Sequence, residues 1–253
     1  MRGKAGAGDS ATTVFGQPRA AFRGHWTRPG EQGNSGALIN ERKNAGGTCL
    51  SRKALPETKK PMKWDAKKEK LIEVYERFER DAEEFKRQAI CKIGCTYCCT
   101  DVGNIDTNTL EGLIIWKRIG SFPPSLKRQI KRKLAKNKRE KEKHPIARCP
   151  FLKGDKTCLI YDIRPFSCRQ LYSIRECRGR GPTVHRQAMA LAKRAVRDLQ
   201  QLDDTGYSGH LSYVLHLLEH PGFREIYLSG GFDPGKIVKF GKAHGIIINR
   251  FVR

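Results

Sequence analysis

The chain has 253 residues and carries 50 lysines and arginines against 26 aspartates and glutamates, a formal net charge of +24. Hydrophobic residues make up 38% of the chain, enough for one sizeable domain with a buried core. No run comes near the roughly 18 consecutive apolar residues of a membrane-spanning helix. The composition therefore excludes a membrane partner and makes nucleic acid a partner to be considered.

Residues 1–61 differ in composition from the rest. They contain ten of the 25 glycines, and eleven lysines and arginines against four acidic residues. Such a stretch buries too little apolar surface to offset its ordering entropy, so we expect a disordered basic tail. The alternative is that translation begins at Met62 and the tail is a misreading of the gene. The N-terminus lacks the apolar stretch of a secretory signal, which predicts a cytoplasmic protein.

Residues 62–253 are expected to form one cysteine-cluster domain with flanking helices. Asp65 is a candidate N-cap, and apolar residues recur at helical spacing from Leu71 to Phe85. The pattern predicts one long amphipathic helix that delivers Cys91 at its end.

A second helix is predicted from Asp106 or Thr107, either of which can cap it, through Trp116. A third, within residues 123–144, carries ten lysines and arginines against two glutamates, with a thin apolar stripe of Leu126, Ile130 and Leu134. Two interpretations of this basic helix stay open. It is a solvated surface, or it binds nucleic acid, although it has no aromatic residues for stacking on bases.

Residues 145–181 contain turn-forming prolines and glycines and are predicted to be a loop with a short β-prone stretch at 158–163. Two more helices are predicted at 184–202 and 207–220, the second ending before Pro221. The expected fold class is mostly α, with helices packed around an irregular, cysteine-rich metal-binding centre and a disordered N-terminal tail.

Eight of the nine cysteines lie in this domain, four of them within the nine residues "CKIGCTYCC". Thiolates are preferred ligands of zinc and of iron–sulfur clusters, usually four to a site, and a reducing cytoplasm favours metal binding over disulfides. Burial as small core residues is a poor alternative for four cysteines beside polar neighbours. The predicted metal ligands are Cys91, Cys95, Cys98, Cys99, Cys149, Cys158, Cys168 and Cys177.

The metal itself is less constrained than its ligands. Adjacent side chains diverge, so the pair Cys98 and Cys99 suits a polynuclear cluster or two neighbouring sites better than one ion. This pair and the surplus of ligands favour iron, including an iron–sulfur cluster, while an all-thiolate zinc site fits the spacing as well. Arginines flank the later cysteines, where guanidinium groups can offset thiolate charge.

The stretch "CKIGCTYCC" followed by "CPFLKGDKTCLIYDIRPFSCRQLYS" resembles the YkgJ-type cysteine-cluster family, described as a zinc- or iron-chelating domain. Six separated elements agree in order and spacing over about residues 88–180, although three residues, rather than the family's two, separate Cys91 from Cys95. The resemblance implies metal chelation. Apart from the ligands, Arg164, Arg169 and Tyr161 are predicted to surround the site without binding the metal.

Two other motifs match by spacing alone. "CKIGCTYC" fits the cluster motif of radical S-adenosylmethionine enzymes, but the alternating strands and helices those enzymes need do not follow it. "HLLEH" places His216 and His220 four residues apart, as in one class of zinc peptidases. Its position at a helix end makes helix capping the better interpretation.

Three function classes therefore stay open. The first is metal chelation, storage or a structural metal site. The second is a cluster-containing enzyme in redox chemistry or in methyl transfer, the latter because a flagellin lysine methylase is among the relatives of the resembling family. The third is a zinc-stapled nucleic-acid-binding module. No base, nucleophile or substrate pocket is evident in the sequence, so it does not decide whether the protein is an enzyme.

Overall fold

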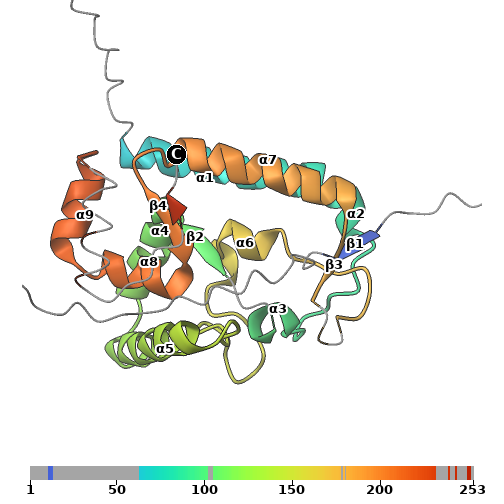
Figure 1. Ribbon diagram of the computed structural model, residues 1–253, viewed down its shortest axis with the longest axis horizontal. Helices are drawn as coiled ribbons and strands as arrows, with labels where there is room; N and C mark the ends of the chain where they lie inside the picture. The colour runs from blue at the N-terminus through green and yellow to red at the C-terminus, as the bar shows by residue number, and fades with distance from the viewer. Residues whose placement is uncertain are drawn as a thin grey trace, which may run out of the picture. The chain divides into compact units, whose positions relative to one another are not determined.

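The computed structural model describes residues 11–13, 63–101, 105–177, 179, 181–231, 239, 243 and 250–251 (Figure 1). Within these ranges the protein is mostly helical, which confirms the predicted fold class at this level. The helices are α1 (Trp64–Asp81), α2 (Glu83–Lys86), α3 (Tyr97–Thr100), α4 (Thr109–Gly120), α5 (Pro124–Lys143), α6 (Phe166–Arg169), α7 (Arg186–Leu202), α8 (Leu211–Leu218) and α9 (Pro221–Leu228), with a 3-10 turn, η1, at Tyr161–Ile163. Of these helices, none combines the length and the apolar character that crossing a membrane requires.

The structure also contains short strands that the sequence patterns did not reveal. These strands pair with one another in antiparallel fashion. Strand β2 (Asp106–Asn108) pairs with β4 (Tyr207–His210), which also pairs with β5 (Arg250–Phe251). Strand β1 (Ala11–Thr13) pairs with β3 (Thr183–His185). Apart from β1, the tail that we expected to be disordered lies outside the described residues. Most of the chain after residue 231 also lies outside them.

Helices α1 and α7 pack against each other because both carry an apolar stripe at helical spacing (Figure 1). The α1 stripe runs from Leu71 to Phe78, as the sequence predicted, and meets Ala192, Ala195 and Leu199 on α7. Small alanines on α7 let the two helices approach closely. Phe166 of α6 joins the same apolar cluster, with its ring 4.8 Å from that of Phe78, so the cysteine-bearing segment is attached to this pair.

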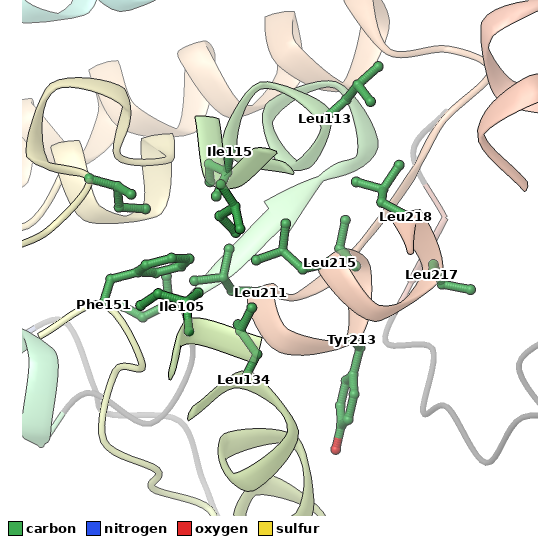
Figure 2. Packing of buried hydrophobic residues seen from close by; sticks show 14 of the residues in the cluster. Ile105, Leu113, Ile115, Leu134, Phe151, Leu211, Tyr213, Leu215, Leu217 and Leu218 are labelled. Atoms are coloured by element: carbon green, nitrogen blue, oxygen red, sulfur yellow. The ribbon is translucent and has the colours of Figure 1, made fainter. Parts of the chain in front are cut away.

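A second apolar cluster forms between α4, α5, α8 and α9. Helix α8 is buried on nearly all sides and supplies Leu211, Leu215 and Leu218 (Figure 2). Ile130 and Leu134 of α5 face this cluster, which confirms the thin apolar stripe of the basic helix. Phe151 belongs to the same cluster, and Cys149, Cys158 and Cys168 pack against it.

The first predicted helix ends earlier than expected. The prediction placed Cys91 at its end, but α1 stops at Asp81 and the short α2 stops at Lys86. The backbone N–H of Ile90 instead donates to the carbonyl of Ser173, 2.9 Å away, so this amide pairs with a distant segment. Cys91 therefore lies in a loop.

The second predicted helix begins later than expected. The cap is neither Asp106 nor Thr107, but Asn108, whose side chain accepts from the backbone N–H of Glu111 at 2.7 Å. The Glu111 carboxylate accepts in return from the N–H of Asn108, which completes a capping box. Asp106 and Thr107 belong to β2 instead.

The last predicted helix, 207–220, is in fact a strand followed by a helix. Residues 207–210 form β4 because they pair with β2, and α8 begins only at Leu211. Pro221 follows the end of α8, as expected, but it also opens α9, since proline is favoured in the first helical turn.

Candidate metal centre

Three segments bring the cysteines together. Helix α3 carries Cys98 and Cys99, the irregular stretch 149–158 carries two more cysteines, and α6 carries Cys168. The backbone N–H of Cys149 donates to the carbonyl of Cys99 at 2.8 Å, which ties the first two segments. An antiparallel bridge between Leu152 and Cys158 closes the second segment on itself. All eight described cysteines are free thiols.

The first group of thiols comprises Cys98, Cys99, Cys149, Cys158 and Cys168. The Sγ atoms of Cys98 and Cys99 are 4.0 Å apart, and the Cys99 thiol also contacts Cys149. Cys98, Cys99 and Cys158 are all close enough to Cys168 for their charges to raise its pKa. Both members of the vicinal pair thus take part in the first group.

Proximity and burial raise the pKa of four thiols of this group and so favour their protonated form: Cys98, Cys99, Cys158 and Cys168. The hydrogen bond with Cys99, followed by burial, raises the pKa of Cys98 far above its ordinary value of 9.0. The contact with Cys149 is the largest cause that raises the pKa of Cys99 to about 12. Burial is the largest cause that raises the pKa of Cys158 and of Cys168. Each thiolate would be stabilised by a cation placed among them.

A second group comprises Cys91, Cys95 and Cys177 and forms around Ser173. The backbone of Ser173 hydrogen-bonds the Cys91 thiol, and its side chain hydrogen-bonds the Cys177 thiol. Burial raises the pKa of both thiols, and the charges of Cys95 and Cys98 raise them further. Cys98 therefore interacts with both groups.

Arg164 is the positive charge within the first group. Its guanidinium lowers the pKa of Cys98, Cys158 and Cys168 and lies 4.1 Å from the centre of the Tyr161 ring. In the described part of the chain, its buried Nε has no hydrogen-bond partner. Arg164 thus carries both a charge and a donor suited to thiolate sulfur. Tyr161 is exposed and contacts Arg164 rather than a thiol.

Arg169 supports the backbone instead of the thiols. Its Nε donates to the carbonyl of Arg164 at 3.0 Å, and a terminal nitrogen donates to the carbonyl of Asp162 at 2.7 Å. The guanidinium also lies over the ring of Tyr75 on α1, at 4.3 Å. Arg169 therefore fixes the loop that presents Arg164.

Glu111 anchors the segment that carries Cys168 to the helices. This buried carboxylate accepts from the N–H of Phe166 at 2.7 Å, and from the hydroxyl of Tyr75. Its other oxygen accepts from Thr107 at 3.2 Å and from the N–H of Asn108 at 3.1 Å. Four donors satisfy this one buried carboxylate, so its position is firmly held.

The sequence reasoning missed Ser173 and Glu111. Ser173 belongs to no cysteine motif, and nothing in the sequence signals its contacts with thiols. Glu111, by contrast, stands three residues after Asn108, the spacing of a capping box, and this signal was available. Its burial and its bond to Phe166 depend on tertiary contacts.

Other predicted or suspected groups lie apart from the thiols. His216 and His220 contact each other, with ring centres 5.5 Å apart, at the junction of α8 and α9. His220 is the residue before α9 and makes no side-chain capping bond there. Cys49 and Arg178 lie outside the described residues.

Thiols are the donors that a thiophilic metal prefers. The described thiols, however, are not arranged around one common position as they would be with a metal bound. Within the described ranges, no three or more cysteine, histidine, aspartate or glutamate side chains are arranged to hold a metal ion. The five neighbouring thiols are nevertheless the type of donor that zinc and iron–sulfur clusters take.

Comparisons with known proteins return no relative. No family model matches the chain, no curated protein matches it, and no solved structure matches it.

Proposed function

We propose that the protein binds zinc or iron, in the latter case including an iron–sulfur cluster, through its cysteine cluster. The observation that carries this proposal is the meeting of thiols from three segments of the chain, 98–99, 149–158 and 168, around Arg164. Thiols that raise one another's pKa impose a cost on their own ionisation, and a bound cation removes it. The resemblance to the YkgJ-type family supports the same proposal.

The chain's residues take different parts in this proposal. Cys98, Cys99, Cys149, Cys158 and Cys168 are proposed as the main donors, with Cys91, Cys95 and Cys177 available for a second site or for an extended cluster. Arg164 offsets the negative charge of the thiolates and donates to sulfur. Arg169 and Glu111 hold the backbone segments that carry Arg164 and Cys168.

Metal loading would then reorganise the centre. The described residues between 145 and 181 have little regular structure, so their thiols can approach one another at small cost in lost helix or strand. A cytoplasmic location belongs to the same proposal, since reducing conditions keep the cysteines as thiols, the form in which they are found.

The test is metal content combined with limited proteolysis on the full chain purified without oxygen. We expect Cys158→Ser or Cys168→Ser to abolish loading of zinc or iron and to leave residues 145–181 sensitive to protease. Cys49→Ser is the matched control, because it removes the one cysteine that is not among the predicted ligands, and it should load metal like the parent. If both cluster variants load metal normally and resist protease, the site assignment is wrong.

The absorption spectrum distinguishes the metals. A brown sample with iron, sulfide and a broad band near about 400 nm identifies an iron–sulfur cluster. A colourless sample with about one or two zinc ions per chain identifies a thiolate zinc site.

A further inference from the structure

Helix α5 is held on the protein by one face only. Ile130 and Leu134 pack into the apolar cluster around α8, and the buried side-chain NH₂ of Asn137 donates to the carbonyl of Arg148 at 2.9 Å. With 3.6 residues per turn, these three residues lie on the same side of the helix. The opposite side therefore faces away from the core.

That opposite side carries a stripe of cations, which we call the α5 stripe: Arg128, Arg132, Arg139 and Lys143. At 3.6 residues per turn the four positions fall within about 60° of one another, and at 1.5 Å per residue they extend over about 22 Å. All four side chains are exposed.

Neighbouring cations on the helix are partly neutralised, whereas the stripe is not. Lys131 pairs with Glu219 at 3.5 Å, and Lys136 and Lys138 pair with Glu140 and Glu142 on their own helix. In the part of the chain that the structure describes, no residue of the α5 stripe forms an ion pair. The stripe is therefore a surface of uncompensated charge, and a row of anions complements it.

We propose that the α5 stripe binds the phosphate backbone of duplex DNA. Each DNA strand winds around the duplex axis, so a straight stripe of about 22 Å meets phosphates of both strands that border a groove rather than a run along one strand. Arginine suits this contact because its guanidinium can bond two phosphate oxygens at once. The proposal does not depend on the metal.

The chemistry of α5 argues against other polyanions. Single-stranded nucleic acid is usually bound with aromatic side chains that stack on bases, and α5 has none. A helix that lies on an anionic membrane buries its apolar face in lipid, but the apolar face of α5 is already used in the core. Seated in a major groove, α5 would place the stripe against the phosphates on the rims of that groove. The deep, narrow major groove of RNA duplexes does not admit a helix, whereas that of B-DNA, about 12 Å wide, does.

The test measures binding of the full chain to a fluorescent 20-base-pair DNA duplex of mixed sequence, over about 50 to 200 mM salt. The variant Arg128→Gln/Arg132→Gln/Arg139→Gln removes three charges of the stripe. The matched control, Arg186→Gln/Arg194→Gln/Arg197→Gln, removes three exposed charges from α7, which packs against α1. Glutamine and arginine have similar helix propensities, and thermal unfolding checks that both variants stay folded.

We expect the stripe variant to bind at least about tenfold more weakly at the lowest salt and to lower the slope of log affinity against log salt by about 2 to 3. The control should keep the slope of the parent. Equal losses in the two variants would reveal only a general charge effect and would overturn the proposal. Tighter binding of the parent to single-stranded DNA, duplex RNA or vesicles of anionic lipid would overturn the choice of duplex DNA.

Discussion

Asp203, just after α7, is a buried carboxyl group whose ionisation opposes folding. It is fully shielded from solvent, and it accepts from the backbone N–H of Leu110 at 3.0 Å and from the hydroxyl of Tyr227. Burial outweighs these two bonds and raises its pKa from the ordinary value of 3.8 to about 6. Because the folded state has the higher pKa, it holds this proton more firmly than the unfolded chain does.

The direction and size of the effect follow from this difference in pKa. The contribution of Asp203 to stability is fully present below about pH 4 and is lost as the pH rises through about 6. A difference of about two pKa units, at about 1.4 kcal/mol each, corresponds to about 3 kcal/mol. The variant Asp203→Asn has no ionisation to oppose folding, so the free energy of unfolding of the parent should fall by about 3 kcal/mol relative to this variant between pH 4 and pH 7.

Urea unfolding followed by circular dichroism at pH 4, 5, 6 and 7 measures this difference. The matched control is Asp204→Asn, because Asp204 is adjacent, its side chain is 66% exposed, and its removal changes the net charge equally. The control should show a far smaller pH dependence relative to the parent. If the stability of the parent relative to Asp203→Asn stays constant with pH, the raised pKa is refuted. If the parent becomes more stable relative to the variant as the pH rises, the hydrogen bonds outweigh burial.

Three further predictions concern the helices and the metal. Tyr75→Phe removes one of the four donors to Glu111 and should lower the free energy of unfolding by about 1 to 3 kcal/mol, measured in urea; an unchanged value would mean that Glu111 does not need this donor. Gly112→Ala places a methyl group 2.7 Å from Cγ1 of Val214 and should cost about 1 to 3 kcal/mol, whereas Gly120→Ala, which meets no atom within 4 Å, should gain up to about 1 kcal/mol; thermal unfolding of both decides, and equal effects would contradict the packing argument. If metal organises residues 145–181, a chelator added to the loaded protein should expose that segment to protease, and unchanged fragments would speak against the centre.

The parts of the fold that were predictable from sequence are those that depend on local periodicity. The apolar stripes of α1 and α5 repeat at helical spacing, so Leu71, Phe78, Ile130 and Leu134 could be placed in the core without knowing their partners. Strands β2 and β4 could not be found in this way. They have three and four residues, and their existence depends on pairing between positions about a hundred residues apart.

The candidate site was also predictable only in part. The cysteines could be chosen by their type and density alone, because few structural roles require four thiols in nine residues. Their division into two groups required the structure, since Cys91 and Cys177 meet at Ser173 only after the chain has folded. The same holds for Arg164 and Arg169, which flank Cys168 alike in sequence. The charge of Arg164 acts on the thiols, whereas Arg169 donates to backbone carbonyls.

The bond between Glu111 and the amide of Phe166 links the stability of the cysteine-bearing segment to that of the helices. It spans 55 positions in the chain, and the hydroxyl of Tyr75 that shares the same carboxylate is 36 positions from Glu111. Opening of the segment around α6 would take one of the four donors from this buried carboxylate, so such opening is costly. The amide of Phe166 should then be among the slowest to exchange with solvent deuterium in the cysteine-bearing segment. Unfolding of α1 or α4 would therefore also release the segment that carries Cys168.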